Sequence, residues 1–192
     1  MSNASNPANF RHSAASFRTH ATRQPLRVAL VTLGVAFLML GILGADLAQA
    51  QSLRQGVAAF NRQDYVLAAR IFTPYAERGA PTAQAYLGFM YETGRGVPQN
   101  YTESAMWYRR AAEQGDSLAQ YSLGQLYDRG QGVPQDIVEA GKWLNLGTAG
   151  APRYAREARS RIRDAVTRKM TRGEIAQARL RALEWVPRRE VP

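Results

Sequence analysis

The sequence predicts an all-α fold: a short α-solenoid of antiparallel helix hairpins with a C-terminal helical cap. Two observations predict it. Residues 65–100 are repeated 36 positions later as residues 101–136, with glycine, proline and aromatic residues at matching places, and apolar residues in each copy recur at helical spacing. A fixed period in this range is typical of stacked helix pairs, because each pair buries its apolar face only against its neighbour.

The first helix of a repeat is best defined in the second copy. Asn100 is a favourable N-cap and Glu103 follows three residues later, which predicts a capping box and a helix that starts near Tyr101. Asp136 and Glu139 predict the same start one repeat later. The apolar positions of this helix are spaced by four, three and four residues: Tyr101, Ala105, Tyr108 and Ala112. Gly115 ends the helix.

The second helix of the repeat begins after a short turn. Asp116 and Ser117 are its candidate caps, and Gly130 ends it after Ala119, Leu123 and Tyr127. Gly124 inside this helix, like Gly88 one copy earlier, costs about 1 kcal/mol of helix propensity relative to Ala. We therefore expect a bulky Tyr or Trp of the partner helix to pass close to both glycines. A Gly-x-Gly-Val-Pro-Gln connector then turns the chain.

The remaining parts of the solenoid are less regular. We assign a half repeat to residues 51–64, full repeats to 65–100 and 101–136, a degenerate repeat to 137–152 and a basic helical cap to 153–192. In the cap, Ala155, Ala158, Ile162, Ala165 and Val166 follow helical spacing and predict a long helix. Thr171 and Glu174 predict another capping box. This box predicts the start of a last helix, which Pro187 ends. The apolar positions of that helix are Ile175, Ala178, Ala182 and Trp185.

These residues resemble the Sel1-like repeat (SLR) family, which is related to the tetratricopeptide repeat. The resemblance covers two full copies, and many independent positions agree at one period. It rests on Leu87-Gly88 with Tyr91, Gly94-x-Gly96-Val97-Pro98, Trp107-Tyr108 with Ala111-Ala112, Leu123-Gly124 with Tyr127, and Gly130-x-Gly132-Val133-Pro134. The resemblance implies a right-handed superhelix and scaffold or adaptor roles in signalling or envelope processes.

The N-terminal segment predicts export. Residues 28–45 are apolar and uncharged, basic residues precede them, and Ala48-Gln49-Ala50 fits a small-residue cleavage site before Gln51. We therefore expect residues 1–50 to be a signal peptide and the protein to be periplasmic or secreted. The alternative is an uncleaved anchor in the inner membrane, since a run of this length is at the lower limit for spanning a bilayer.

Composition excludes several chemistries from residues 51–192. This stretch contains neither Cys nor His, so it has no disulfide, no thiolate nucleophile, no Ser-His-Asp triad and no zinc site of the usual type. We expect no cofactor, no metal and no enzymatic activity. Only a carboxylate mechanism remains, and Glu103 and Glu139 already have predicted capping roles. Trp107, Tyr108, Trp143 and Trp185 lie on or beside apolar stripes, where core packing is expected.

Charge divides the chain into two parts. Residues 51–152 carry nine basic and nine acidic residues, whereas residues 153–192 carry twelve basic and five acidic residues. The cap is therefore either a solvated basic face or a surface that holds anionic lipid or polysaccharide. Nucleic acid is not expected as a partner, because no aromatic residues interleave the arginines. Membrane contact is expected only through a retained leader.

Matching exposed positions on the first helices are the candidate partner-binding site, because positions without a structural role are free to fit a partner. Ordinary surface variation is the other interpretation. The sequence thus predicts an exported, non-catalytic protein-interaction module that binds a protein or peptide on its concave helical face. The alternative is an envelope-surface protein that uses its basic cap. The candidate residues are Arg70, Thr73, Met106, Arg109, Arg110, Lys142 and Asn145.

Overall fold

The computed structural model describes residues 50–190, and this part of the chain is built from eight helices without a strand. The first helix covers residues 50–61. The others are α2 (Tyr65–Glu77), α3 (Pro81–Thr93), α4 (Tyr101–Glu113), α5 (Ser117–Arg129), α6 (Ile137–Ala149), α7 (Arg153–Thr167) and α8 (Arg172–Leu183). The predicted leader lies outside the described residues except for Ala50, so its cleavage remains a prediction. Within residues 50–190, no helix has the length and apolarity that crossing a membrane requires.

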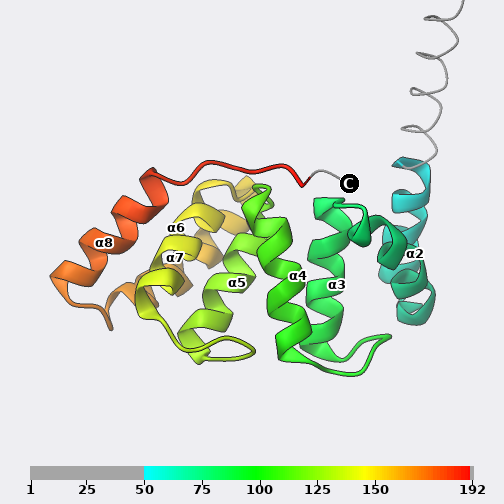
Figure 1. The fold of residues 1–192 in the computed structure, drawn as a ribbon, viewed down its shortest axis with the longest axis horizontal. Coiled ribbons are helices and arrows are strands. Elements are labelled where there is room, and N and C mark those ends of the chain that lie inside the picture. The colour runs from blue at the N-terminus through cyan, green and yellow to red at the C-terminus, as the bar shows by residue number, and fades with distance from the viewer. Residues whose placement is uncertain (1–49, 191–192) are drawn as a thin grey trace, which may run out of the picture. The chain divides into compact units, whose positions relative to one another are not determined.

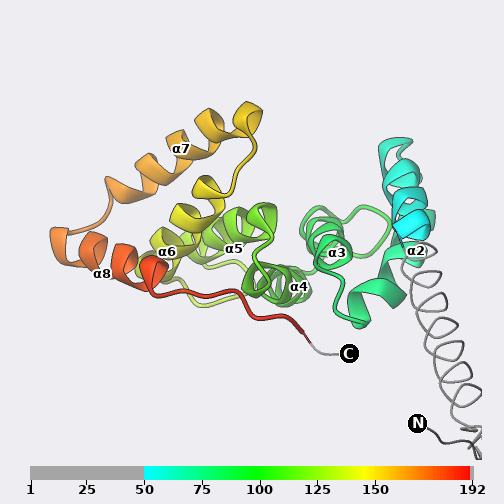
Figure 2. The same cartoon turned by 90° about the horizontal axis from the view of Figure 1, so that it is seen from above.

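The helices form hairpins that stack in sequence order (Figure 1; Figure 2). Helix α2 pairs with α3, α4 pairs with α5, and α6 packs against α7. Successive hairpins contact each other through α3 with α4 and through α5 with α6. The two sequence copies therefore lean on one another, which confirms the predicted solenoid.

The apolar core runs through the stack as three adjoining clusters. The first is centred on Phe72 and Leu87, the second on Tyr108 and Leu123, and the third on Leu144. Each cluster combines side chains of neighbouring hairpins, so no hairpin has a complete core of its own. This arrangement is expected when each unit buries its apolar face only against the next one.

Glycine makes the close helix contacts possible. Phe72, Tyr108 and Leu144 occupy equivalent places 36 residues apart, and each approaches a glycine of the preceding helix. A Cβ added at Gly88 would lie 2.6 Å from Cδ1 of Tyr108, and a Cβ at Gly124 would lie 2.8 Å from Cγ of Leu144. The expected aromatic neighbour is confirmed at Gly88. The expectation was wrong at Gly124, where a leucine fills the equivalent place.

Helix starts follow the predicted caps with one difference. Asn100 and Asp136 each accept hydrogen bonds from two backbone amides of the following turn, and Asp116 accepts one from Ala119. The full capping box forms at Thr171, where Glu174 returns the bond. Among the described residues it does not form at Asn100 or Asp136. At Asp136 the reason is visible, because the Glu139 carboxylate bonds Lys142 and Arg181 instead.

The connectors between hairpins use the predicted glycines. Gly94 and Gly130 end α3 and α5 with φ values of 70° and 66°, which are left-handed angles that favour glycine. After each of them a glutamine side chain donates to a carbonyl oxygen near the end of the preceding helix. Gln99 bonds the carbonyl of Glu92, and Gln135 bonds that of Asp128. The connector is thus a repeated structural unit.

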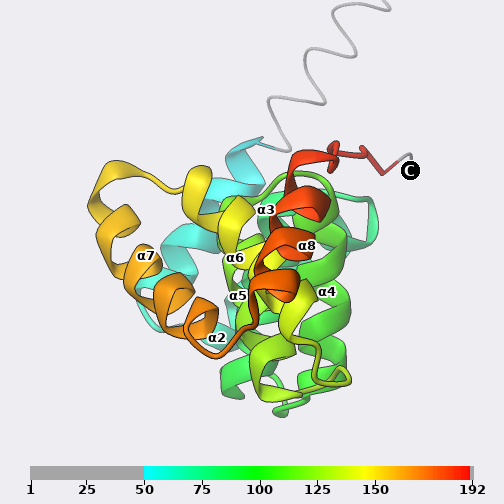
Figure 3. The same ribbon diagram turned by 90° about the vertical axis from the view of Figure 1, so that its left-hand side faces the viewer.

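The cap differs from the prediction in two ways. Figure 3 shows α6 lying between α7 and α8, and both helices pack against α6. In α7 the apolar residues at helical spacing are only partly buried: Val166 packs in the third core cluster, whereas Ala158 and Ile162 are exposed and Arg159 is buried. The α8 helix ends at Leu183, before Trp185, which lies in an extended segment. Pro187 has no N–H to donate to the carbonyl of Leu183, four residues earlier, and its ring would clash with that carbonyl in a continued helix, so the helix ends before Trp185.

Candidate functional site

The chain after α8 forms an extended segment, residues 184–190, that we call the C-terminal segment. It runs back past α6 and α4 towards α3 (Figure 1; Figure 2). This path crosses the first helices of the repeats, the elements on which the sequence placed a partner-binding surface. The candidate site is therefore a face that already holds a stretch of polypeptide.

The segment is anchored at its start by Trp185. The Trp185 ring makes an edge-to-face contact with Trp143 of α6, with ring centroids 6.3 Å apart. Trp185 and Pro187 also lie beside Gly115, the turn residue after α4. Trp143 and Trp185 line a cleft together with Glu113, Lys142 and neighbouring residues of the segment. An aromatic side chain thus fixes this end of the segment against the solenoid.

A main-chain hydrogen bond holds the middle of the segment. The backbone N–H of Arg188 donates to the carbonyl oxygen of Glu113 at 2.8 Å. Glu113 is the last residue of α4, where helix carbonyls have no partner within the helix. The α4 terminus therefore offers an acceptor that any extended chain can use, whatever its side chains.

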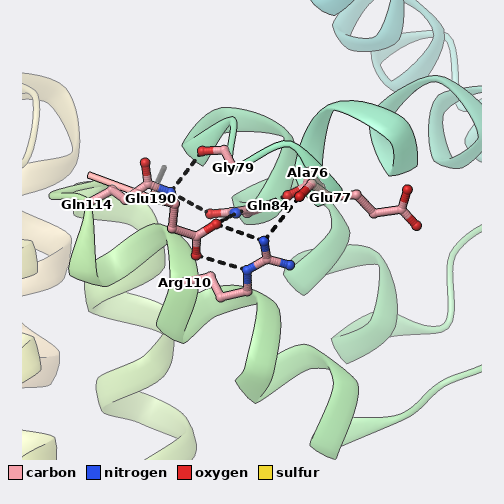
Figure 4. A network of polar contacts seen from close by, with 7 residues as sticks. All are labelled: Ala76, Glu77, Gly79, Gln84, Arg110, Gln114 and Glu190. Carbon is pink, nitrogen blue, oxygen red and sulfur yellow. Dashed lines mark hydrogen bonds and ion pairs between the residues drawn. The ribbon is translucent and has the colours of Figure 1, made fainter. Parts of the chain in front are cut away.

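Glu190 anchors the far end of the described segment (Figure 4). Arg110 donates to both carboxylate oxygens, from Nε to Oε1 at 2.9 Å and from Nη2 to Oε2 at 2.7 Å. The Arg110 guanidinium lies 4.8 Å from the ring centre of Trp107, one turn earlier on α4. Stacking on the indole and the paired hydrogen bonds fix the plane of the guanidinium, which suits it to a planar carboxylate.

Two glutamines complete the carboxylate pocket. Gln84, which is fully buried, donates from Nε2 to Glu190 Oε2 at 2.9 Å and to the carbonyl of Ala76 at 3.0 Å. Its Oε1 accepts a hydrogen bond of 2.9 Å from Gln114, which also donates to the carbonyl of Gly79. Figure 4 shows Gln84 of α3 and Arg110 of α4 bonding Glu190, while Gln114 bonds Gln84 and the carbonyl of Gly79 in the turn after α2. We call Gln84, Arg110 and Gln114 the carboxylate pocket.

Hydrogen bonding also changes the ionisation of the paired groups. The bonds from Arg110 lower the pKa of the Glu190 carboxyl, partial burial opposes this effect, and the Gln84 bond adds to the lowering. The bond to Glu190 raises the pKa of Arg110. Both shifts favour the ion pair over its neutral form. The side chains of Arg110 and Glu190 remain 31% and 27% exposed, so solvent screens the interaction in part.

The pocket combines a repeated feature with a local one. Gln120 is the equivalent of Gln84 one repeat later, and its Nε2 donates to the carbonyl of Ala112, the equivalent of Ala76. This bond is therefore part of the repeat structure. The positions equivalent to Arg110 hold Pro74 and Leu146, so the other repeats lack the guanidinium. Among residues 50–190, a carboxylate pocket of this composition therefore forms between α3 and α4 alone.

Of the seven candidate residues from the sequence, Arg110 forms hydrogen bonds with the C-terminal segment. Arg109 points to Tyr127, whose hydroxyl accepts its hydrogen bond at 2.8 Å. Lys142 lies 4.2 Å from the Trp143 ring centre and pairs with Glu139. Arg70 and Met106 are exposed, Thr73 bonds the carbonyl of Ala69, and Asn145 lines a cleft with α8.

The sequence did not reveal the other members of the site. Gln84 recurs as Gln120 one repeat later, and this recurrence was the signal in the sequence that could have predicted a structural role for the glutamine at this position. Trp185 was assigned to a helix, and Glu113, Gln114 and Glu190 were not singled out. Glu190 follows Pro187 in a stretch without periodicity, so no spacing argument connects it to Arg110.

One of the two carboxylates considered for acid-base catalysis, Glu139, is held in ion pairs. Glu139 forms ion pairs with Lys142 and Arg181, and Glu103 lies in the first turn of α4, one repeat earlier. Among residues 50–190, no group of His, Cys, Asp and Glu side chains has the arrangement of a metal site.

The basic cap is partly engaged in internal contacts. Arg159 is buried and donates to the carbonyls of Ser117 and Gly147 at 2.9 and 2.8 Å. Ion pairs also hold four further basic side chains of the cap: Arg161, Arg163, Lys169 and Arg181. The other basic residues of the cap are exposed. The cap is thus both a structural element and a source of free positive charge.

The stacked helix hairpins define a helical-repeat protein. The model of the Sel1 repeat matches residues 81–116 and 117–149, and the chain therefore carries two Sel1 repeats. These matches have the 36-residue period and begin at α3 and α5. Sel1-repeat folds typically mediate protein-protein interaction, and Sel1-repeat proteins are generally non-catalytic interaction modules.

Solved structures show the same fold. The chain is similar to c5321, a protective antigen present in uropathogenic Escherichia coli strains that displays an SLR fold, with 28% identity and a TM-score of 0.64. It is also similar to a Sel1 repeat protein from Oxalobacter formigenes, with 26% identity and a TM-score of 0.55. Each match covers 71% of this chain, but only 29% and 55% of the two relatives. A comparison with curated protein sequences gave no match.

Proposed function

We propose that this protein is an exported, non-catalytic module that binds a protein partner on the face of its first helices. The observation that carries the proposal is the C-terminal segment itself. An extended polypeptide lies across α6 and α4 and is bound through an aromatic contact, a main-chain hydrogen bond and a carboxylate pocket. These are general means of holding an extended peptide on a preformed surface.

The rigid scaffold suits this role. The first helices are fixed by the buried core on their inner side, so their outward residues are positioned before a partner arrives. Little backbone ordering is then needed on association. The exposed candidate residues Arg70, Met106 and Arg109 extend the surface beyond the C-terminal segment and would set specificity.

A second function has a separate basis in the cap. Exposed arginines that include Arg153, Arg168 and Arg172 carry no ion pair among the described contacts and offer a surface for anionic lipid or polysaccharide. In that case the solenoid is a spacer and the first-helix face is not the binding surface.

A pull-down from envelope extract at low and moderate salt separates the two functions. One variant changes Arg70, Arg109 and Lys142 together to Glu, and a matched variant changes Arg153, Arg168 and Arg172 to Glu. A partner bound on the first-helix face survives moderate salt, is lost in the first variant and is kept in the second. A steep loss with salt and dependence on the cap arginines would instead establish the polyanion function.

The control for both variants is the circular dichroism spectrum and melting temperature. Lys142 is close to Glu139, so its reversal places two negative charges together, and the variants must retain the wild-type helix content. If both variants fold like the wild type and still capture the partner to the same extent, the proposal that the partner binds on the first-helix face is wrong.

A further inference from the structure

The C-terminal segment lies on the surface to which the proposed function assigns a partner, and it is bound there by contacts that a separate peptide could also make. We propose that residues 184–190 are an internal ligand that blocks this face. The partner, which rests on the proposed function above, is then an extended peptide with an aromatic residue and, five positions later, a carboxylate. Trp185 and Glu190 are the model for these two residues.

The segment is attached at a few points only. Trp185 and Glu190 are partly buried, whereas residues 186–189 between them are exposed, and Val186 is 69% exposed. Besides the bond from Glu184 to Leu180, which ends α8, the main-chain bond from Arg188 to Glu113 is the one further hydrogen bond that this segment makes to the described helices. A stretch with few buried contacts belongs to the part of a protein that opens most readily. The segment can therefore leave while the helices stay folded.

The carboxylate pocket requires an acceptor when the segment leaves. Gln84 is fully buried, and one N–H of its amide is used by Ala76, as in the equivalent glutamine of the next repeat. Its other N–H is directed to Glu190. Arg110 presents Nε and Nη2 to the same place. Three donors around one position select a planar, negatively charged acceptor, which is a carboxylate.

The other contacts add a spacing requirement. The cleft at Trp143, which holds Trp185, and the pocket at Arg110, which holds Glu190, are connected by the four residues 186–189 in extended form, and the Glu113 carbonyl takes a main-chain N–H between them. Proline at position 187 has no N–H, and the segment needs none there. Arg188 and Arg189 are exposed and do not contribute to selection.

Competition follows from the covalent connection. The segment is joined to α8, so its effective concentration at the face is in the millimolar range for a short flexible link. A separate peptide binds only the fraction of molecules in which the segment has left, and its apparent affinity is reduced by that fraction. Weakening the internal contact should therefore strengthen binding of the same peptide added from outside.

The test uses a fluorescein-labelled peptide with the sequence of residues 184–190 and an amidated C-terminus, measured by fluorescence anisotropy. The proteins are the full wild-type chain and a full chain carrying Trp185→Ala and Glu190→Gln. We expect the peptide to bind the double variant at least about tenfold more tightly than wild type. A peptide with Glu190→Gln should bind the double variant about tenfold more weakly than the unchanged peptide.

Two further variants in the same background identify the pocket. Arg110→Gln should weaken peptide binding about tenfold, whereas Arg78→Gln, which removes an exposed arginine at the end of α2, should leave it unchanged. A chain that ends at Leu183 provides a second open form without new side chains. Circular dichroism establishes that each variant keeps its helices.

Equal binding to the wild type and to both open forms, or no binding to either open form, overturns the inference. If the peptide test fails in this way but the pull-down captures a partner that the first-helix variant loses, the proposed function still stands. Peptide binding as expected, without any capture that depends on the first-helix face, contradicts the proposed function and leaves the internal ligand standing.

Discussion

The guanidinium of Arg110 and the carboxylate of Glu190 form two hydrogen bonds, of 2.9 and 2.7 Å, although 80 positions of sequence separate them. This pair connects the end of the chain to the second hairpin. Between Trp185 and Glu190, the C-terminal segment crosses the face on which repeat positions are free to vary. The stability of this contact therefore determines whether the face is open or covered.

Loss of the Arg110 side chain should release the segment locally. In Arg110→Gln, we expect the amide proton of Arg188 to exchange about fivefold faster, corresponding to about 1 kcal/mol for a partly exposed ion pair. Arg188 is a suitable reporter because its N–H donates to the Glu113 carbonyl only while the segment is docked. Native-state hydrogen exchange measures the effect. Arg78→Gln is the control, and equal acceleration in both variants would contradict the assigned pairing.

Acid should release the same segment. The pKa of Glu190 is lowered, first by its hydrogen bonds from Arg110, so ionised Glu190 stabilises docking above about pH 4.5. This stabilisation is lost as the pH falls through the lowered pKa. An NMR titration of the Arg188 amide should show a transition below pH 4.5 that is missing in Glu190→Gln. A transition that persists in this variant would assign the acid release to another carboxyl group.

Gly88→Ala should destabilise the solenoid although alanine is the better helix former. The added Cβ would lie 2.6 Å from Cδ1 of Tyr108, whose hydroxyl also donates to Glu92, so the ring cannot move freely. We expect a loss of about 1–3 kcal/mol in the free energy of unfolding. Gly173→Ala in α8 is the matched control, because its nearest neighbour lies 4.0 Å away. It should stabilise by about 0.4–1 kcal/mol, and urea denaturation compares the two.

Arg159 should be essential for attaching α7. It is the buried arginine of the cap, and its guanidinium bonds the carbonyls of Ser117 and Gly147 beside the Tyr121 ring. Arg159→Ala leaves both buried carbonyls without this donor, and we expect a loss of about 2–4 kcal/mol in unfolding free energy. Arg161→Ala, on the exposed side of the same helix, should change stability by less than about 0.5 kcal/mol. Similar losses in both variants would show that helix propensity, not the buried bonds, is responsible.

Most of the features of the fold that we predicted correctly come from the 36-residue repeat. The starts of α4, α5 and α6 and the glycine stops followed from local chemistry, because capping side chains and left-handed glycines act within a few residues. The close approach at Gly88 also followed from the cost of a glycine inside a helix. These features repeat, so each prediction had an independent copy to support it.

The cap and the occupied face could not be predicted in the same way. In α7 an arginine is buried while Ala158 and Ile162 are exposed, because carbonyls of two other helices create a polar site that no sequence spacing reveals. The C-terminal segment has no period and makes its contacts through tertiary structure. Arg110 was a candidate by its position on the first helices, but its partner Glu190 depends on how the chain returns after Pro187.

The most direct test of the docked segment is an engineered disulfide, since residues 50–190 contain no cysteine. A Cβ added at Gly115 would lie 3.8 Å from Cβ of Pro187, which matches the usual Cβ separation in disulfides. Gly115 has a φ of 97°, so Gly115→Cys carries a cost of about 1–3 kcal/mol, and helix content must be checked. The Gly115→Cys, Pro187→Cys chain, oxidised under mild conditions, is followed by its mobility on non-reducing gels. We predict rapid, nearly complete cross-linking that slows when Trp185→Ala and Glu190→Gln are added. Slow cross-linking that these substitutions do not change would contradict a segment held on the first-helix face.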